Sequence, residues 1–576
     1  MKSSRMQRST SKISNAIIAD FVRRYAAALA VEGADRFKLK AYRRAAETIE
    51  GLDEAVVELI EQGRELTALP GIGKAINEVI LEIVRTGELA RLAQTTSKLA
   101  PELAELVSRP ALDPKKVGRI YKKFGIDSLA QLQAKLDAGT VRDVFGARME
   151  FHVRQGLSDR RRGLLWSVEE LAEKIESYLR ALSEVTHASR VGSLRRRQET
   201  VGDLNFLVAG PSAASIFKRF AQFGAVQSWE AEGRSLRHYK LSSGFTVSLR
   251  WSKPEEWGLS LILATGSDVH VQQLAARGKA KKLALKSASL TKNGTQLKQE
   301  KAIYAALGLK FIEPELREGR GEVEAAANRK LPELVTLEQL RGDLHMHTTA
   351  SDGANSIAEM AEAARQRGYE YIAITDHSQS LKITNGLTES RLLQHIEAID
   401  ELNSRLKGFR ILKSAEVDIL EDGSLDYSNA VLQRLDLTIC SIHSRFALGK
   451  QQQTERILRA MDNPYFNILG HATGRLLLSR EGYELDIERI IDHAKTTGCM
   501  FEINSSPNRL DLSDEHAKLA KQAGIKIAIN TDAHSIRELD FISAGVNQAR
   551  RGWLEAADVL NTYPLTQLKK FLRRGG

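Results

Sequence analysis

The chain has 576 residues, of which 42% are hydrophobic and 27% are charged, and its formal net charge is +11. This composition is typical of a globular protein with about four domains of roughly 150 residues each, and the positive charge favours either a polyanionic partner or a generic basic surface. No apolar run approaches the roughly 20 residues of a membrane span, and the two cysteines exclude a disulfide framework. We expect a cytoplasmic protein without membrane contact, and a monomer is the favoured oligomeric state.

Residues 1–90 place apolar side chains at helical spacing and predict a first helical domain. Within residues 66–89, a Pro-Gly-Ile-Gly-Lys turn separates two helical patterns, as in a helix–hairpin–helix motif. In that motif the glycines let backbone N–H groups approach a DNA phosphate at a helix N-terminus. Gly71, Gly73 and Lys74 are therefore candidate DNA contacts, and an ordinary glycine-rich turn is the alternative.

A second helical domain is predicted over residues 91–160, with another candidate hairpin at 109–126. Lys115 and Lys116 are its candidate DNA contacts. Ala111 and Asp113 stand where such a hairpin has glycines, so simple packing is the alternative. Residues 144–153 are a candidate for a third, degenerate copy. A basic helical half of this kind is consistent with a sequence-independent grip on phosphates.

Residues 161–317 change character, because strand-like runs appear among the helices. Gly-Ser-Leu-Arg-Arg at 192–196, Glu-Thr-Val-Gly-Asp at 199–203 and Thr-Gly-Ser at 265–267 resemble the nucleotidyltransferase palm and thumb of family X DNA polymerases. The helical region ahead of them resembles the lyase-like and fingers domains of that family. The resemblance implies contacts to a nucleoside triphosphate from six residues, Gly192, Ser193, Arg196, Thr265, Gly266 and Ser267. For the arginine run, a solvated turn is the alternative.

The palm departs from the family at the positions that hold metal ions. Phosphoryl transfer by two metals needs carboxylates around Mg²⁺, and the family has three aspartates there. Asp203 keeps the first position, whereas Asn205 and Ser248 occupy the other two. The family's Schiff-base lysine falls on Val79. We interpret the palm as a relic that still binds DNA, with Mg²⁺ expected there only if it is active.

A polar connector at 318–341 leads to the last predicted domain, residues 342–576. Seven short apolar runs alternate with helical patterns there, which predicts a parallel sheet. Because candidate ligands gather at the ends of these runs, we predict a distorted (β/α)7 barrel, whose strand ends converge on one mouth. The predicted fold is therefore multidomain: a helical region, an α+β palm and thumb, and a C-terminal barrel.

The strand ends carry residues that bind metals. Nine of the 13 histidines follow Arg341, and six of these nine lie at strand ends, whereas His395, His493 and His516 fall in helical stretches and are interpreted as surface residues. One such histidine would usually be a core residue, but six of them with acidic neighbours predict a metal centre of two or three ions, Mn²⁺ or Zn²⁺. The candidate ligands are His345, His347, Asp352, His377, Glu416, His443, His471, Asp532 and His534.

These residues resemble the polymerase-and-histidinol-phosphatase (PHP) domain, through Asp-Leu-His-x-His-Thr, Ser-Asp-Gly, Thr-Asp-His, a lone Glu, two single His and Asp-x-His. A palm and a PHP domain in one chain resemble the bacterial family X DNA polymerases over almost the whole length. The resemblance implies a Mn²⁺-dependent 3′–5′ exonuclease, with apurinic-site endonuclease and 3′-phosphatase as further activities. Arg509 is a candidate to hold a substrate phosphate, and a salt bridge to Asp511 or Asp514 is the alternative.

The leading hypothesis is a metal-dependent phosphoesterase that processes DNA 3′ ends at gaps or nicks. Its candidate catalytic residues are His345, Glu416 and Asp532, with Asp203 in the palm. The first alternative is a gap-filling DNA polymerase that uses dNTP and needs a further carboxylate, for which Glu199 is the candidate. The second alternative is a DNA-binding scaffold without catalysis. A small-molecule phosphatase ranks lowest, because it leaves the basic helical half unexplained.

Overall fold

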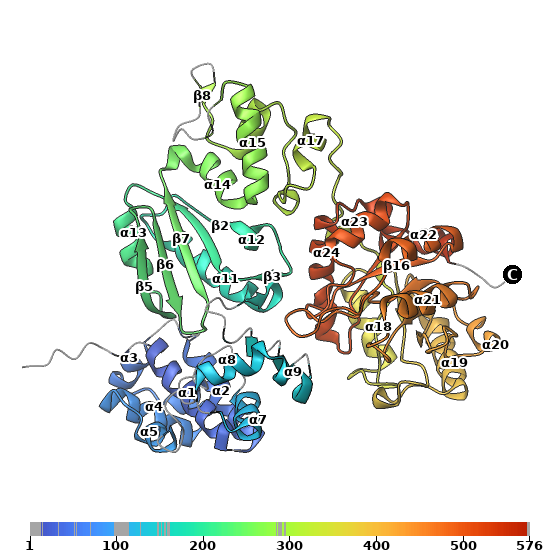
Figure 1. Cartoon of the computed structure of the whole chain (residues 1–576), viewed down its shortest axis with the longest axis horizontal. Coiled ribbons are helices and arrows are strands. Elements are labelled where there is room, and N and C mark those ends of the chain that lie inside the picture. Colours follow the sequence, from blue (N-terminus) through green and yellow to red (C-terminus); the bar gives the residue numbers. More distant parts are fainter. Residues whose placement is uncertain are drawn as a thin grey trace, which may run out of the picture. The chain divides into compact units, whose positions relative to one another are not determined.

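Figure 1 shows the computed structural model of the chain, which describes residues 13–572 except 14, 33, 51, 53–54, 70, 97–113, 127, 147–148, 151–152, 155–156, 158–161, 284, 286–290 and 293–294. The chain forms two compact units. The first consists of Met1–Gly163, Glu170–Val191 and Val201–Leu261, and the second of Leu164–Glu169, Gly192–Thr200 and Ile262–Gly576. No described helix combines the length and the apolar character needed to cross a membrane.

The first unit begins with helices packed around one apolar core, in which Ile18, Ala46, Val79 and Ile83 are fully buried. The helices follow the predicted spacing of apolar residues, because each one turns one stripe inward. They are α1 (Asn15–Glu32), α2 (Arg36–Glu50), α3 (Val56–Glu61), α4 (Lys74–Thr86) and α5 (Ala90–Thr96). A second core is formed by α7 (Pro114–Phe124), α8 (Leu129–Asp137) and α9 (Thr140–Phe145).

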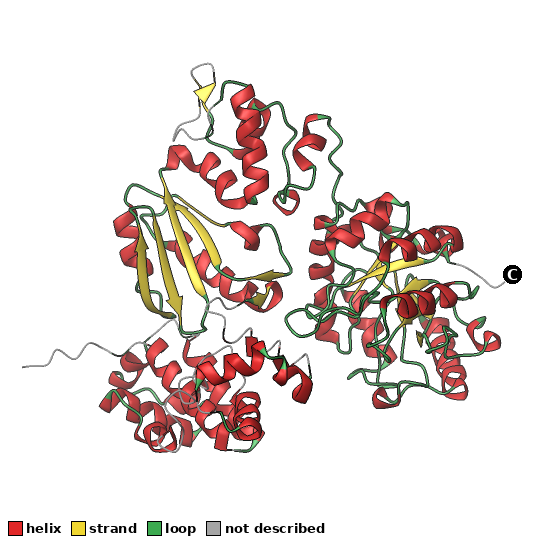
Figure 2. Cartoon of the chain, in the orientation of Figure 1, coloured by secondary structure: helices red, strands yellow, loops and turns green. Residues whose placement is uncertain are grey.

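A five-stranded sheet completes the first unit, and it appears in yellow in Figure 2. Its order is β2 (His187–Arg190), β4 (Leu204–Ala209), β7 (Thr246–Ser252), β6 (Leu236–Leu241) and β5 (Val226–Glu232). β4 and β7 are parallel and the other pairs are antiparallel. This register pairs Ser248 with Asn205 on one side and with His238 on the other. The α13 helix (Ala213–Phe220) packs on the sheet through Phe220, which contacts Tyr239.

The second unit opens with short helices joined by buried ion pairs. Arg195 donates to both Glu300 oxygens, and the fully buried Arg317 donates to the same carboxylate. His270 lies 2.6 Å from Glu322, and both side chains are fully buried. The predicted connector 318–341 is thus a folded, partly buried stretch. The helices are α12 (Gly192–Arg195), α14 (Trp257–Thr265), α15 (Asp268–Ala280), α16 (Glu300–Ala306) and α17 (Glu322–Ala327).

The C-terminal part contains two sheets whose strand pairs are all parallel. One has three strands: β10 (Gly342–Asp343), β11 (Tyr371–Ile374) and β12 (Arg410–Lys413). The other has five: β13 (Glu416–Asp418), β14 (Ile439–Ser441), β15 (Ile468–Leu469), β16 (Met500–Asn504) and β17 (Ile527–Asn530). Isolated parallel bridges join them, His377 to Glu416 and Met346 to Ala533, so the strands follow one another in a closed series.

One of the seven short apolar runs from which we predicted the strands, residues 410–419, is divided in the structure. Its first half is β12 and its second half is β13, and the two halves belong to different sheets. The division places Glu416 at the start of β13, where it pairs with Ile439. Helices alternate with the strands as expected: α18 (Ile357–Gln366), α19 (Glu389–Arg405), α20 (Asn429–Leu432), α21 (Lys450–Met461), α22 (Ile487–Thr497), α23 (Asp514–Gln522), α24 (Ile542–Arg551) and α25 (Leu565–Phe571).

Candidate metal centre

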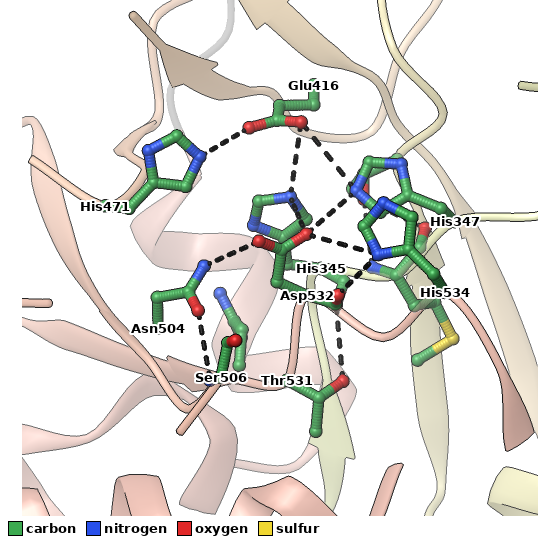
Figure 3. Close-up of polar contacts among 12 residues, drawn as sticks. His345, His347, Glu416, His471, Asn504, Ser506, Thr531, Asp532 and His534 are labelled. Carbon is green, nitrogen blue, oxygen red and sulfur yellow. Dashed lines mark hydrogen bonds and ion pairs between the residues drawn. The ribbon is translucent and has the colours of Figure 1, made fainter. Parts of the chain in front are cut away.

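The nine candidate ligands of the C-terminal domain lie together at or beside the strand ends. Figure 3 shows His345, His347, Glu416, His471, Asp532 and His534 among them. Parallel strands bring them together because the C-terminal ends of such strands meet at one edge. Most of the side chains are buried, and Asp352 and His534 are the most open to solvent of the nine. Three groups have ligand atoms within 4.8 Å of one another. They are His347, Asp352, His377 and His534; His345, His347 and Asp532; and His377, Glu416 and His443.

Glu416 occupies a central position among the imidazole rings. Its Oε1 lies 2.9 Å from His471 Nε2 and 3.3 Å from His443 Nε2. Its Oε2 lies 2.8 Å from His377 Nδ1 and 3.6 Å from His345 Nε2. A carboxylate that has neighbours on both oxygens is suited to bridging two ions. Figure 3 shows the contacts of Glu416 with His471 and His345.

Asp532 and Asp352 are the other two carboxylates among the candidate ligands. Asp532 Oδ1 lies 3.0 Å from His347 Nε2 and 3.5 Å from His345 Nε2. Asp352 lies 3.4 Å from His534 Nε2 and 3.6 Å from His377 Nε2. Each carboxylate therefore faces two imidazoles, which is the mixed donor set that Mn²⁺ and Zn²⁺ accept.

The residues fit a bound cation. Three buried atoms of the cluster, His345 Nε2, His347 Nδ1 and Glu416 Oε2, make no hydrogen bond within the described parts of the chain, although His377 forms an ion pair with Glu416 Oε2. Buried polar atoms are nearly always hydrogen-bonded, so the lone pairs of these atoms are available to a cation. Burial opposes the charge of Glu416, but His443, His377 and His345 outweigh it and hold the pKa of that carboxyl well below its usual range. The carboxylate is therefore ionised, as a metal ligand must be.

His347 remains neutral, which a metal-binding imidazole requires. Burial, together with the neighbouring His377 and His534, lowers the pKa of His347 to about 4. A neutral ring keeps a lone pair available for a cation.

Two further carboxylates orient the ligand rings, and the sequence analysis did not select them. Glu502 Oε1 lies 2.7 Å from Nδ1 of His345, so this nitrogen donates and leaves Nε2 facing the cluster. Asp418 lies 2.7 Å from Nδ1 of His443 in the same way. Such outer carboxylates fix the tautomer and orientation of a ligand histidine. The sequence feature that could have identified Asp418 is its position two residues after Glu416, because such residues point to the same side of a strand.

The interpretation of His395 as a surface residue is wrong. Its side chain is 8% exposed and its Nε2 lies 3.1 Å from Asp376. Asp376 also accepts hydrogen bonds from Thr348 and Ser351, which border the loop of Asp352. Helical position alone did not reveal that this face of α19 packs against the site.

Arg509 lies at the metal centre, with Nε 3.6 Å from Asp532 Oδ2. The two alternative partners make other contacts: Asp511 accepts a hydrogen bond from Thr473, and Asp514 pairs with Arg551 and Arg320. Because Asp532 is a candidate ligand, the guanidinium of Arg509 borders the cluster. The Arg509 side chain is 23% exposed.

The palm positions without carboxylates make neutral hydrogen bonds. Asn205 Nδ2 donates to the backbone oxygen of Asp203, at 3.2 Å. Ser248 Oγ lies 2.9 Å from Nδ1 of His238, whose Nε2 lies 2.9 Å from Glu232. Asp203 is half-buried. Neither replacement brings negative charge to the position that it occupies.

The predicted nucleotide contacts of the second unit lie together. Arg196 Nη1 donates to the backbone oxygen of Thr265, at 2.8 Å. Gly192 begins α12 with Ser193, Gly266 ends the turn after α14, and Ser267 caps α15. However, Arg196 Nε also donates to Glu318, at 3.0 Å.

Glu199, the further carboxylate of the polymerase hypothesis, is already engaged. Its Oε1 accepts hydrogen bonds from Arg475 and from Gln548 of the C-terminal domain. Both partners also donate to the backbone oxygen of Leu510, so the carboxylate is part of a fixed network. This observation weakens its proposed role in the palm.

The first hairpin turn is open to solvent. Gly71 has a φ of +81°, a left-handed conformation that favours glycine, and Gly73 caps the N-terminus of α4. Lys74 is exposed at the start of that helix. Lys116 is half-buried in α7. The side chain of Lys115 and residues 109–113 lie outside the described residues, as does part of the third candidate copy.

Three protein-family descriptions match the chain: a helix-hairpin-helix domain at residues 13–89, a DNA polymerase beta thumb at 260–318 and a PHP domain at 343–506. A "DNA polymerase/3′-5′ exonuclease PolX" of Bacillus subtilis (strain 168) is 37% identical over 557 residues, which cover 94% of this chain and 96% of the relative. A probable phosphatase of Thermoanaerobacter sp. (strain X514) is 31% identical over 242 residues, 40% of this chain and 94% of the relative.

The match to the Bacillus protein extends over nearly the full length of both chains, whereas the phosphatase matches a part that is less than half of this one. The helical, thumb and PHP parts occur in the order that the sequence predicted. On this evidence, the chain belongs to the PolX type of family X DNA polymerases, with a C-terminal PHP domain.

Proposed function

We propose that the protein is a DNA-processing enzyme whose PHP domain is a metal-dependent 3′–5′ exonuclease. The observation that carries the proposal is the contrast between two sites: nine converging imidazoles and carboxylates in the PHP domain, and a palm in which Asn205 and Ser248 contribute no charge. The related Bacillus protein is named as a polymerase and a 3′–5′ exonuclease, which supports it. Apurinic-site cleavage and 3′-phosphate removal are further reactions for the same centre.

The nine candidate ligands would hold two or three ions, Mn²⁺ or Zn²⁺. Such ions supply charge neutralisation for a phosphodiester and acidify water near neutral pH. Glu416, Asp532 and His345 would be among the residues that hold these ions. Glu502 and Asp418 keep the rings of His345 and His443 in the orientation that this requires.

Arg509 would bind the phosphate next to the scissile bond. A guanidinium presents paired N–H donors that match two phosphate oxygens. Its partial exposure beside Asp532 leaves it accessible to a DNA strand that reaches the cluster.

The helix–hairpin–helix turn would hold the DNA through its phosphates. Gly71 and Gly73 bring backbone N–H groups to a phosphate, and Lys74 adds a positive charge. The palm would contribute to the same grip. We propose gapped, nicked or 3′-ended DNA as the partner, acted on by a monomer in the cytoplasm, where the free thiols Cys440 and Cys499 would stay reduced.

The test is an assay with Mn²⁺ on a gapped duplex whose primer strand is 5′-labelled, comparing wild type, His345→Ala and Asp203→Ala. We expect the primer to shorten with wild type and Asp203→Ala, and to remain intact with His345→Ala. If wild type leaves the primer intact under these conditions, the proposal fails.

A gap-filling DNA polymerase is the second candidate, favoured by the name of the Bacillus relative. It predicts that dNTP addition lengthens the primer and is lost in Asp203→Ala but kept in His345→Ala. The hydrogen bonds that Arg475 and Gln548 donate to Glu199 Oε1 argue against it, because they already neutralise and orient the carboxylate that Mg²⁺ would need.

A further inference from the structure

A single apolar side chain protrudes from the loop that follows the candidate ligand His377. Ile383 is 92% exposed, more than any other large hydrophobic side chain in the described residues. It lies in the short 3-10 helix Lys382–Thr384, within the segment 378–387 that links β11 to α19, and we call this segment the Ile383 loop. The neighbouring Lys382 is exposed and positively charged.

The Ile383 loop is held in place by hydrogen bonds at both ends. Ser380 donates its N–H to Asp426 Oδ2, at 2.6 Å, and Gln379 donates to the backbone oxygen of Asp426, at 3.0 Å. At the other end, Arg391 donates to the backbone oxygens of Asn385 and Gly386, at 2.9 and 3.3 Å. The exposure of Ile383 is therefore a property of an ordered loop.

The same loop borders the metal centre. Asn385 Nδ2 and Arg391 Nη2 both donate to the backbone oxygen of Ala350, at 3.2 and 2.6 Å. Ala350 precedes by two residues the candidate ligand Asp352, which lies 3.4 Å from His534. The Ile383 loop thus begins directly after the candidate ligand His377. Its hydrogen bonds attach it to the segment that carries another candidate ligand, Asp352.

Three of the candidate ligands, His345, His347 and Glu416, are at most 1% exposed, whereas Asp352 and His534 are the most exposed of the nine. A DNA strand is therefore expected to reach the centre from the side of Asp352, whose segment is attached to the Ile383 loop. We expect a 3′ end that is paired to a template to enter more readily once its terminal base pair has opened. Proteins that open base steps do so with apolar side chains that replace the stacking of a base.

On the basis of the proposed exonuclease, we propose that Ile383 is a wedge that stacks on the terminal base pair and separates the 3′ strand from its template. Lys382 would contact the phosphate of one separated strand. Ile383 would thereby determine whether the enzyme degrades paired 3′ ends as well as single strands. The group that the Ile383 side chain would contact is a DNA base at a duplex end.

The experiment measures shortening with Mn²⁺ on one labelled oligonucleotide, alone and annealed so that its 3′ end is paired. In Ile383→Ala, we expect the ratio of the paired rate to the single-strand rate to fall about fivefold or more, because the apolar wedge against the terminal base is lost. A terminal mismatch should restore much of the paired rate, and Ile383→Phe should keep the wild-type ratio. Leu519→Ala removes an exposed leucine of α23 and serves as the matched control.

The outcomes separate the two proposals. If Ile383→Ala leaves the ratio unchanged, or slows both substrates equally, the wedge is refuted while the exonuclease stands. If wild type shortens neither substrate, the exonuclease itself is refuted. Unchanged thermal unfolding of Ile383→Ala would show that a lowered ratio does not come from misfolding.

Discussion

Glu502 shows how a single buried carboxylate controls a metal ligand. Its Oε1 faces His345 Nδ1, and its Oε2 accepts the backbone N–H of His471, at 2.9 Å. Burial opposes its ionisation, but His345 and His471 outweigh burial and lower the pKa of the Glu502 carboxyl. The residue is thus a permanent anion that fixes one ligand ring and one ligand backbone.

Removal of this carboxylate should weaken metal binding. In Glu502→Ala, we expect the affinity for Mn²⁺ to fall about 10- to 100-fold, the usual effect of losing an outer-sphere partner. Calorimetric titration with Mn²⁺ measures this directly. Glu401→Ala, which removes an exposed glutamate of α19, is the control. An unchanged affinity in Glu502→Ala would show that His345 needs no orienting group.

The palm offers a gain-of-function prediction at the same scale. Asn205 and Ser248 pair across β4 and β7, so aspartates at both positions would add two charges to one face near Asp203. We expect Asn205→Asp/Ser248→Asp to extend a primer with Mg²⁺ and dNTP faster than wild type, because two-metal catalysis needs these carboxylates. Adding Asp203→Ala should abolish the gain. A double variant as inactive as wild type would mean that the palm lacks more than charge.

At the scale of elements, α24 connects the PHP domain to the thumb region through charged groups. Arg551 of this helix donates to Glu318, at 2.8 Å, and to Asp514, at 2.7 Å. Arg196 shares Glu318, and Arg320 shares Asp514. Burial opposes the charge of Glu318, yet Arg551 and Arg196 outweigh it and lower the pKa of that carboxyl. The network is therefore held by ionised, mostly buried groups.

This network predicts acid sensitivity with a defined sign. Because the pKa of Glu318 is lowered in the fold from an ordinary 4.5, its contribution is present above pH 4.5 and is lost as the pH falls through the lower folded value. Glu318→Gln should destabilise the protein by about 3 kcal/mol at pH 7, since two arginines lose their buried counter-charge. Urea unfolding at several pH values should show this difference shrinking below pH 4.5, whereas Glu324→Gln on the exposed face of α17 should change little.

At the scale of the whole molecule, DNA binding and chemistry are expected to reside in different parts of the chain. Chelation with EDTA should abolish primer shortening but leave most DNA affinity, because the phosphate contacts that we propose for the hairpin use backbone N–H groups and need no divalent ion. Lys74→Ala should weaken DNA binding uniformly across sequences and reduce the dependence of affinity on salt. Fluorescence anisotropy measures both, with Lys407→Ala as a control at an exposed lysine of the PHP domain. Loss of all DNA binding with EDTA would contradict this separation.

The sequence by itself determined the family, the order of the parts and the candidate ligands, because short motifs with fixed spacing mark strand ends and helix starts. His345 and His347, two residues apart, indicated one shared face through their spacing alone. Only the tertiary structure decided which groups support them. Glu502 forms a hydrogen bond with His345, which is 157 residues away in the sequence, and Glu199 accepts one from Arg475, which is 276 residues away. Such partners leave no local pattern, since they meet only when distant strands and helices pack together.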